Sequence, residues 1–158
     1  PLSVFIGAFP GAIPFMLGWV SATNKFGIEP GILFMLQFFW QFPHFWAISW
    51  VMHDDYQKAG FKMLPTGKKD NSTSAQILFY CFWSVIISII PFFGFTGELK
   101  LSLIGLIIVL LLGIFLIYKS YNLFIDGKNE NARKLMVTSV IYLTFVQLTF
   151  LFDKILNL

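Results

Sequence analysis

The stretch Leu101-Ser-Leu-Ile-Gly-Leu-Ile-Ile-Val-Leu-Leu-Leu-Gly-Ile-Phe-Leu-Ile-Tyr118 is almost entirely apolar and contains no charged residue. A helix needs roughly 20 mainly apolar residues to cross about 30 Å of hydrocarbon, so this stretch predicts a membrane span over about 99–121. Of the 158 residues in the chain, 57% are hydrophobic, 19% are aromatic and only 12% are charged. Soluble domains carry about 25% charged residues. The composition therefore excludes a soluble globular domain, a disordered segment and a nucleic-acid-binding protein.

Four further apolar stretches repeat this pattern along the chain. They cover about 3–22, 31–52, 75–95 and 135–157. Glycine and proline interrupt the first stretch and end the third, which membrane helices tolerate when neighbouring helices satisfy the freed backbone groups. The sequence thus predicts an all-α, multi-pass transmembrane helical bundle with five spans, forming a single membrane domain over 1–158.

Basic residues are unevenly distributed among the segments that join these spans. Segments 53–74 and 119–134 contain four lysines or arginines each, whereas segments 23–30 and 96–100 contain one each. Positively charged loops favour the cytoplasmic side of a membrane. We therefore expect both basic segments to face the cytoplasm, as five antiparallel crossings require. The chain starts with Pro1 and has no basic stretch before its first apolar run, which predicts no signal peptide and a true N-terminus further upstream.

Three polar side chains interrupt the second span, within Gln37-Phe-Phe-Trp-Gln41-Phe-Pro-His44. At about 100° per residue, Gln37, Gln41 and His44 share one helix face. In an unbroken helix Asp55 would return to that face about 16 Å beyond His44. Two interpretations stay open, namely a helix–helix contact in which amides bond across the bundle and a functional cavity.

The segment His53-Asp54-Asp55-Tyr56-Gln57-Lys58-Ala59-Gly60-Phe61-Lys62-Met63-Leu64-Pro65 combines paired carboxylates with two lysines. Oxygen ligands at a membrane boundary suit Mg²⁺, which keeps several waters and commonly joins carboxylate to phosphate. Lys58 and Lys62 would add positive charge toward phosphate oxygens. The alternative is a solvated loop whose lysines only determine topology.

The first and last spans contain further features of interest. Gly7 and Gly11, four residues apart, predict a surface for close helix approach. The single cysteine, Cys81, excludes an internal disulfide and is expected to be a buried apolar residue. Three polar residues of the last span either line a cavity or bond within the bundle: Tyr142, Gln147 and Asp153.

Three motifs occur in a recognisable order. They are Gly7-x-x-x-Gly11-Ala-x-Pro14-x-x-x-Gly18-Trp19, Trp40-Gln-x-Pro43-His44-Phe45-Trp46-Ala47 and Asp54-Asp55-Tyr56-x-x-Ala59-Gly60-x-x-Met63-Leu64-Pro65. With this order and spacing, the sequence resembles the protoheme IX farnesyltransferases (heme O synthases), a family of UbiA-type intramembrane prenyltransferases. The resemblance covers the whole chain and is strongest over residues 5–66.

The resemblance implies a membrane enzyme of about nine helices in which two acidic cytoplasmic segments hold farnesyl diphosphate through Mg²⁺. Such an enzyme transfers the farnesyl group to a vinyl side chain of heme b (protoheme IX), giving heme O and diphosphate. Segment 53–65 corresponds to the second acidic segment, with Asp55 at the position that carries Asp or Glu and Asp54 at a more variable one. The first acidic segment, of the Asn-x-x-x-Asp-x-x-x-Asp kind, is absent from the sequence. We therefore expect the last five of about nine spans, which are inactive alone.

The resemblance also implies roles for individual residues. Asp55 and Lys58 are the expected catalytic residues, and Asp55 and Asp54 are the expected metal ligands. Aromatic walls such as Trp40 and Phe45 would shelter an allylic cation from water. Substrate binding is expected from His44, Trp40, Gln41, Tyr56 and Lys62. For His44 the alternatives are contact with the iron or the propionates of heme and a purely structural hydrogen bond.

The residues leave other functions open, and the resemblance implies a set of partners. A prenyltransferase for a quinone precursor or other lipid acceptor is one alternative, and a non-catalytic membrane subunit or transporter is another. The expected partners are heme b, farnesyl diphosphate and membrane lipid, with heme A synthase or terminal oxidase assembly proteins in addition and no nucleic acid. The expected location is the bacterial inner (plasma) membrane, with the mitochondrial inner membrane as the weaker alternative.

Overall fold

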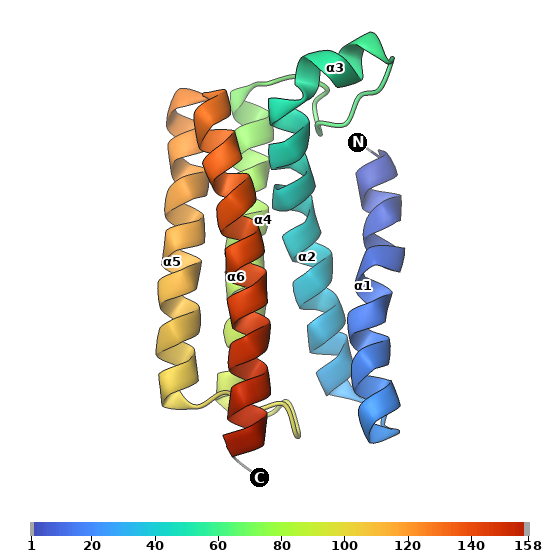
Figure 1. Cartoon of the computed structure of the whole chain (residues 1–158), viewed down its shortest axis with the longest axis vertical. Coiled ribbons are helices and arrows are strands. Elements are labelled where there is room, and N and C mark those ends of the chain that lie inside the picture. The colour runs from blue at the N-terminus through green and yellow to red at the C-terminus, as the bar shows by residue number, and fades with distance from the viewer. Residues whose placement is uncertain (1, 157–158) are drawn as a thin grey trace.

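The computed structural model describes residues 2–156, and every regular element in that range is a helix. Five long helices run side by side as a bundle (Figure 1). They are α1 (Leu2–Thr23), α2 (Ile28–Val51), α4 (Asn71–Ile89), α5 (Leu103–Asp126) and α6 (Asn129–Leu156). Two short helices connect them, α3 (His53–Lys58) and the 3-10 helix η1 (Ile90–Phe93). The predicted all-α class is confirmed.

Within residues 2–156, four helices are long and apolar enough to cross a membrane. They are Ser3–Thr23, Asn71–Phe93, Leu103–Asp126 and Asn129–Leu156. Helix α2 is long enough, with 24 residues, but it is not among the helices that are apolar enough to span a membrane. Its glutamines, histidine and tryptophans lower its hydropathy. The five-span count therefore stays a prediction at this helix.

Helix α2 occupies the centre of the bundle, since it packs against α1, α4 and α6. Figure 1 shows it between α1 and α6. Polar side chains take part in the contacts of α2 with α1 and with α6. The Gln41 Nε2 atom donates to the carbonyl of Ala8 in α1 at 3.1 Å, and the Trp40 Nε1 atom donates to the carbonyl of Ser139 in α6 at 2.6 Å. Enclosure by protein is the setting in which polar residues are tolerated at membrane depth.

Local capping residues determine where several helices begin and end. The Asp70 side chain caps α4 by accepting from the Thr73 amide at 2.8 Å, and the Ser102 side chain caps α5 by accepting from the Gly105 amide at 3.0 Å. Such caps satisfy amides that have no partner within the helix. At its far end α5 stops at Gly127, whose φ of 61° is left-handed and favours glycine.

The two basic segments lie at the same end of the bundle, as predicted. There Lys69 Nζ donates to Asn129 Oδ1 at 3.1 Å, and Trp50 Nε1 donates to the carbonyl of Gly127 at 3.3 Å. At the opposite end the Lys25 ammonium pairs with Glu98 at 2.5 Å. The number of basic residues in each joining segment thus predicts correctly which segments lie at the same end of the bundle.

Of the two glycines predicted to allow close approach of helices, one does so. A Cβ atom added to Gly11 would lie 2.2 Å from Gln41 Oε1, so α1 and α2 come together at this point. The prediction is wrong for Gly7, which is exposed and has nothing within 4 Å of the corresponding position. Its four-residue spacing from Gly11 places it on the same side of α1, but α2 does not reach it closely.

We predict that Gly11→Ala lowers the thermal unfolding midpoint of the chain in detergent. The added methyl group would displace the buried Gln41 amide from its partner in α1, and overpacking of this kind typically costs about 1–3 kcal/mol. Gly7→Ala is the matched control, because its methyl group enters open space. Equal midpoints for the two variants would show that the α1–α2 contact does not depend on this close approach.

Candidate functional site

The acidic segment begins directly after the central helix, but it does not continue that helix. Helix α2 ends at Val51 and α3 starts at His53, with the backbone of Met52 at φ −93° and ψ 17° between them. Figure 1 shows α3 running across the end of the bundle rather than along α2. The expectation that an unbroken helix places Asp55 on the same face as His44 is therefore wrong.

Both carboxylates of the segment are open to solvent. Asp54 and Asp55 are exposed, and the Asp55 carboxylate has one ion-pair contact, with Lys58 Nζ at 4.0 Å. The Asp55 side chain is 69% exposed and that of Lys58 is 80% exposed. Exposed ion pairs of this kind contribute little to stability, so the Asp55 carboxylate stays accessible to a ligand from solution.

In the part of the chain that the structure describes, side chains alone form no complete metal site. Within residues 2–156 no group of three or more His, Cys, Asp or Glu side chains is placed to hold a metal ion. Asp54 and Asp55 therefore fit only an ion that takes its remaining ligands from water or from a substrate. Mg²⁺ behaves in this way, since it is usually bound by one or two carboxylates together with phosphate oxygens.

The loop after α3 folds back on the helix through hydrogen bonds to backbone carbonyl groups. The Phe61 amide donates to the carbonyl of Tyr56 at 2.9 Å, and Gln57 Nε2 donates to the carbonyl of Gly67 at 3.3 Å. Leu64 anchors the loop, because only 1% of it is exposed. Tyr56 is partly buried and Lys62 is exposed. The loop thus presents its predicted substrate-binding side chains from an ordered backbone.

A carboxylate network ends this loop at the start of α4. Asp70 accepts from the Thr73 amide at 2.8 Å and from the Thr66 hydroxyl at 2.9 Å. The hydrogen bond from the Thr73 amide lowers the pKa of Asp70 below its ordinary value, with the Thr66 hydroxyl adding to the effect. Asp70 lies outside the predicted site residues and positions the loop that carries them.

The polar face of α2 serves two different purposes. Gln41 lies in a helix–helix contact, because its Nε2 donates to the carbonyls of Ala8 and Gln37 at 3.1 and 3.3 Å. His44, three residues on, turns instead toward α6, where its Nδ1 lies 2.8 Å from Ser139 Oγ. Gln41 therefore supports the interpretation as a helix–helix contact. His44 is only partly buried and stays a candidate for the interpretation as a functional cavity.

Ser139 is a residue that the sequence analysis missed. It is fully buried and contacts both Trp40 and His44, whose rings stack with centroids 4.6 Å apart. Its position next to Thr138 in an otherwise apolar stretch was the available signal, because polar groups in a span need partners. The sequence gives no indication of which helix those partners occupy.

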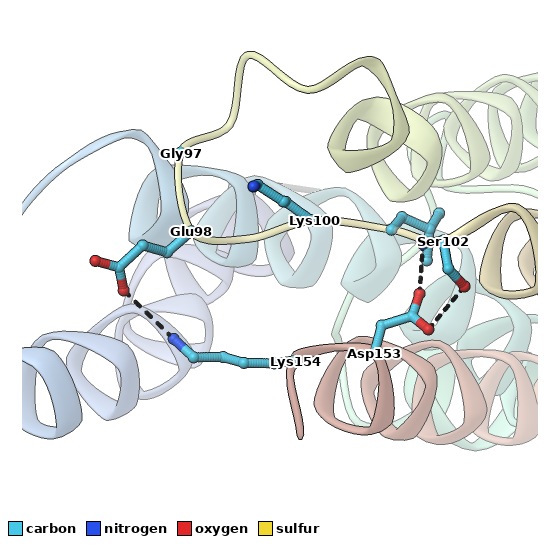
Figure 2. Close-up of a pocket in the computed structure, with 7 residues that line it drawn as sticks. Gly97, Glu98, Lys100, Ser102, Asp153 and Lys154 are labelled. Atoms are coloured by element: carbon cyan, nitrogen blue, oxygen red, sulfur yellow. Dashed lines mark hydrogen bonds and ion pairs between the residues drawn. The ribbon is translucent and has the colours of Figure 1, made fainter. Parts of the chain in front are cut away.

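The opposite end of the bundle holds a pocket of about 480 Å³, lined by the loop 97–102 that joins η1 to α5 and by the end of α6 (Figure 2). Asp153 accepts from the Ser102 amide and hydroxyl at 2.6 and 2.8 Å, and Lys154 pairs with Glu98 at 3.7 Å. These contacts hold the start of α5 against the end of α6. Asp153 thus both lines a cavity and bonds within the bundle, which unites the two predicted alternatives.

The other two polar residues of the last span divide between these roles. The Tyr142 hydroxyl is buried and donates to the carbonyl of Ser84 at 3.1 Å. Gln147 lines a mainly apolar pocket of about 500 Å³ beside Trp19 and Lys154. Cys81 is buried, as predicted. Sequence alone left these roles undecided because each depends on a partner from another helix.

Comparison with known protein families identifies the family of this chain. Residues 1–146 match the model of the UbiA prenyltransferase family. The chain belongs to the UbiA prenyltransferase family. Family membership confirms the resemblance and establishes a membrane-integral protein, and prenyltransferases of this family generally use a divalent metal to bind diphosphate.

Several curated relatives of this UbiA family member are named protoheme IX farnesyltransferase. The protein of Christiangramia forsetii is 56% identical over 157 residues, covering 99% of this chain and 52% of the relative. That of Flavobacterium psychrophilum is 54% identical, covering 99% and 52%, and that of Cytophaga hutchinsonii is 42% identical, covering 98% and 53%. The chain thus spans about half the length of the curated relatives it matches. No solved structure matches it.

We predict that Asp70→Ala in this UbiA family member speeds hydrogen exchange at the Thr73 amide about fivefold at neutral pH, since a lost helix cap costs about 1 kcal/mol. Because folding lowers the pKa of Asp70, its contribution is present above the ordinary value of 3.8 and is lost as the pH falls through the lower folded value. Acid should therefore weaken protection in the wild type but not in the variant. Ser72→Ala, at an exposed neighbouring position, is the control, and equal exchange in both variants would contradict the capping role.

Proposed function

We propose that this chain forms part of an enzyme that transfers the farnesyl group of farnesyl diphosphate to a vinyl side chain of heme b, giving heme O and diphosphate. The observation that carries the proposal is an accessible Asp55 carboxylate, with Lys58 beside it, in the short helix α3 that follows the central helix of a UbiA prenyltransferase family member. Relatives named protoheme IX farnesyltransferase, up to 56% identical, support this choice of reaction.

The diphosphate is proposed to bind at the acidic segment. Asp55, with Asp54 as a second ligand, would hold Mg²⁺, and both are exposed as such a role requires. When bound, the ion would supply positive charge that stabilises the departing diphosphate. Lys58, the second proposed catalytic residue, would add its ammonium group to the same stabilisation. Lys62 would bind the phosphate oxygens from the neighbouring loop.

The acceptor and the isoprenoid are proposed to lie along the polar and aromatic face of α2. Trp40 and the exposed Phe45 would exclude water from the allylic carbon as its bond to oxygen weakens. His44 would contact the heme, and Tyr56 would border the diphosphate. Both hydrogens of the Gln41 amide are directed to carbonyl groups of α1 and α2. These contacts do not support substrate binding by Gln41, which stays a prediction.

The charge distribution supports a proposed orientation in the membrane. The end that holds the acidic segment also carries both basic segments, joined by the contact of Lys69 with Asn129. We propose that this end faces the cytoplasm of a bacterium, with the protein in the inner (plasma) membrane. Diphosphate would then be released on the side where soluble isoprenoid diphosphates are available. Heme A synthase or oxidase assembly proteins stay proposed partners.

We predict that Asp55→Asn lowers heme O formation at least 100-fold, because the variant loses a ligand of the Mg²⁺ that would stabilise the departing diphosphate, and loss of such transition-state stabilisation typically costs about 10²- to 10³-fold. The assay replaces the matching segment of the Christiangramia forsetii relative with this chain, expresses the chimera in cells that make no heme O, and determines the extracted hemes by mass. Asp54→Asn should cause a smaller loss. Glu130→Gln, which removes an exposed carboxylate at the same end of the bundle, is the matched control.

Two results would contradict these proposals separately. A chimera that inserts in the membrane but forms no farnesylated heme would contradict the proposed reaction. Heme O formation at the wild-type level by Asp55→Asn would leave the reaction intact and remove Asp55 from the diphosphate site.

A further inference from the structure

We propose that Ser139 is a positioning residue that holds His44 in a single tautomer, with the proton on Nδ1 and an unprotonated Nε2 available to coordinate the iron of heme b. The proposal rests on the function proposed above, in which heme b is the acceptor substrate. It identifies the part of the heme that His44 contacts.

The first step concerns the single proton of the Ser139 hydroxyl. Ser139 Oγ lies 2.7 Å from the carbonyl oxygen of Met136, one turn earlier in α6. A carbonyl oxygen can only accept a hydrogen bond, and two acceptors do not approach this closely without a proton between them. The hydroxyl proton therefore points to Met136 and is not available to His44.

The second step follows for the imidazole. His44 Nδ1 lies 2.8 Å from the same Ser139 Oγ, which toward the ring can now act only as an acceptor. Nδ1 must then donate, and a neutral imidazole has only one ring proton. Nε2 is left with its lone pair. Among residues 2–156 no carboxylate forms an ion pair with His44, so none stabilises a doubly protonated ring.

The ring is also held in orientation. Trp40 stacks on it with an interplanar angle of 14°, and the Trp40 indole is itself bound to the Ser139 carbonyl at 2.6 Å. One residue of α6 thus positions both the edge of the imidazole and the aromatic ring that covers its face. Ser139 is fully buried, so water cannot readily replace its hydroxyl. Histidine ligands of metals are commonly oriented by a hydrogen bond at their other nitrogen in this way.

The tautomer decides between the two contacts expected for His44. An unprotonated Nε2 can give its electron pair to iron, but it cannot donate a hydrogen bond to a propionate carboxylate. His44 is partly buried and belongs to a helix whose polar face lies between α1 and α6, since Gln41 bonds to the first and His44 to the second. The geometry therefore favours a contact of His44 with the heme iron.

The test measures porphyrin binding by the chain itself in lipid nanodiscs. Hemin and iron-free protoporphyrin IX serve as probes, since both carry the propionates and only hemin carries iron. We expect hemin to bind at least tenfold more tightly, with a Soret shift that His44→Ala abolishes. Ser139→Ala should weaken hemin binding about 10- to 100-fold and leave protoporphyrin binding unchanged, while Ser139→Thr, which keeps the hydroxyl, should restore most of the affinity.

Nitrogen-15 NMR of labelled histidine in the wild-type chain tests the tautomer without any substitution. We expect an attached proton on Nδ1 of His44 and none on Nε2. A protonated Nε2, or equal affinity of hemin for the wild type and Ser139→Ala, would overturn the proposal. Normal heme O formation by a Ser139→Ala chimera without a change in the hemin spectrum would contradict this inference alone. Hemin coordination by His44 in a chimera that forms no heme O would instead contradict the proposed reaction and uphold the inference.

Discussion

The need to pair polar side chains inside an apolar bundle determines the position of α2, and the rest of the structure depends on that position. Gln41 bonds to the Ala8 carbonyl of α1, and Trp40 and His44 bond to Ser139 of α6. In hydrocarbon an unpaired polar group costs several kcal/mol, so these bonds favour the position of α2 between α1 and α6, although Gln37 Oε1 and Trp46 Nε1 of the same helix are buried without a hydrogen-bond partner among the described residues. The acidic segment at the end of α2 is thereby held at one end of the bundle.

The positions of the long helices could be predicted because each contains an apolar run long enough to cross a membrane. Their boundaries were less accurate, since hydropathy does not detect capped polar turns. Helix α6 begins at Asn129 rather than near 135, and α4 begins after its cap at Asp70. Helix α2 shows the opposite limit, because enclosure by α1, α4 and α6 permits a polar content that a lipid-exposed helix would not tolerate.

The candidate site could be predicted only in part. Residue types and spacing identified the acidic segment and the polar face of α2, and the periodicity placed Gln41 and His44 close together on that face. The break at Met52 was not predicted, because no proline or glycine marks it. Ser139 was not predicted either, since it is 95 residues from His44 along the chain and only tertiary packing brings the two together.

The central role of α2 is tested most directly by a distance measurement between α1 and α2. Solid-state NMR on the chain in lipid, with the glutamine side-chain nitrogens and the alanine carbonyl carbons labelled, detects the dipolar coupling across this contact. The structure predicts a coupling between Gln41 Nε2 and the Ala8 carbonyl, in accord with their hydrogen bond of 3.1 Å. Absence of any coupling between these two residues would contradict the account.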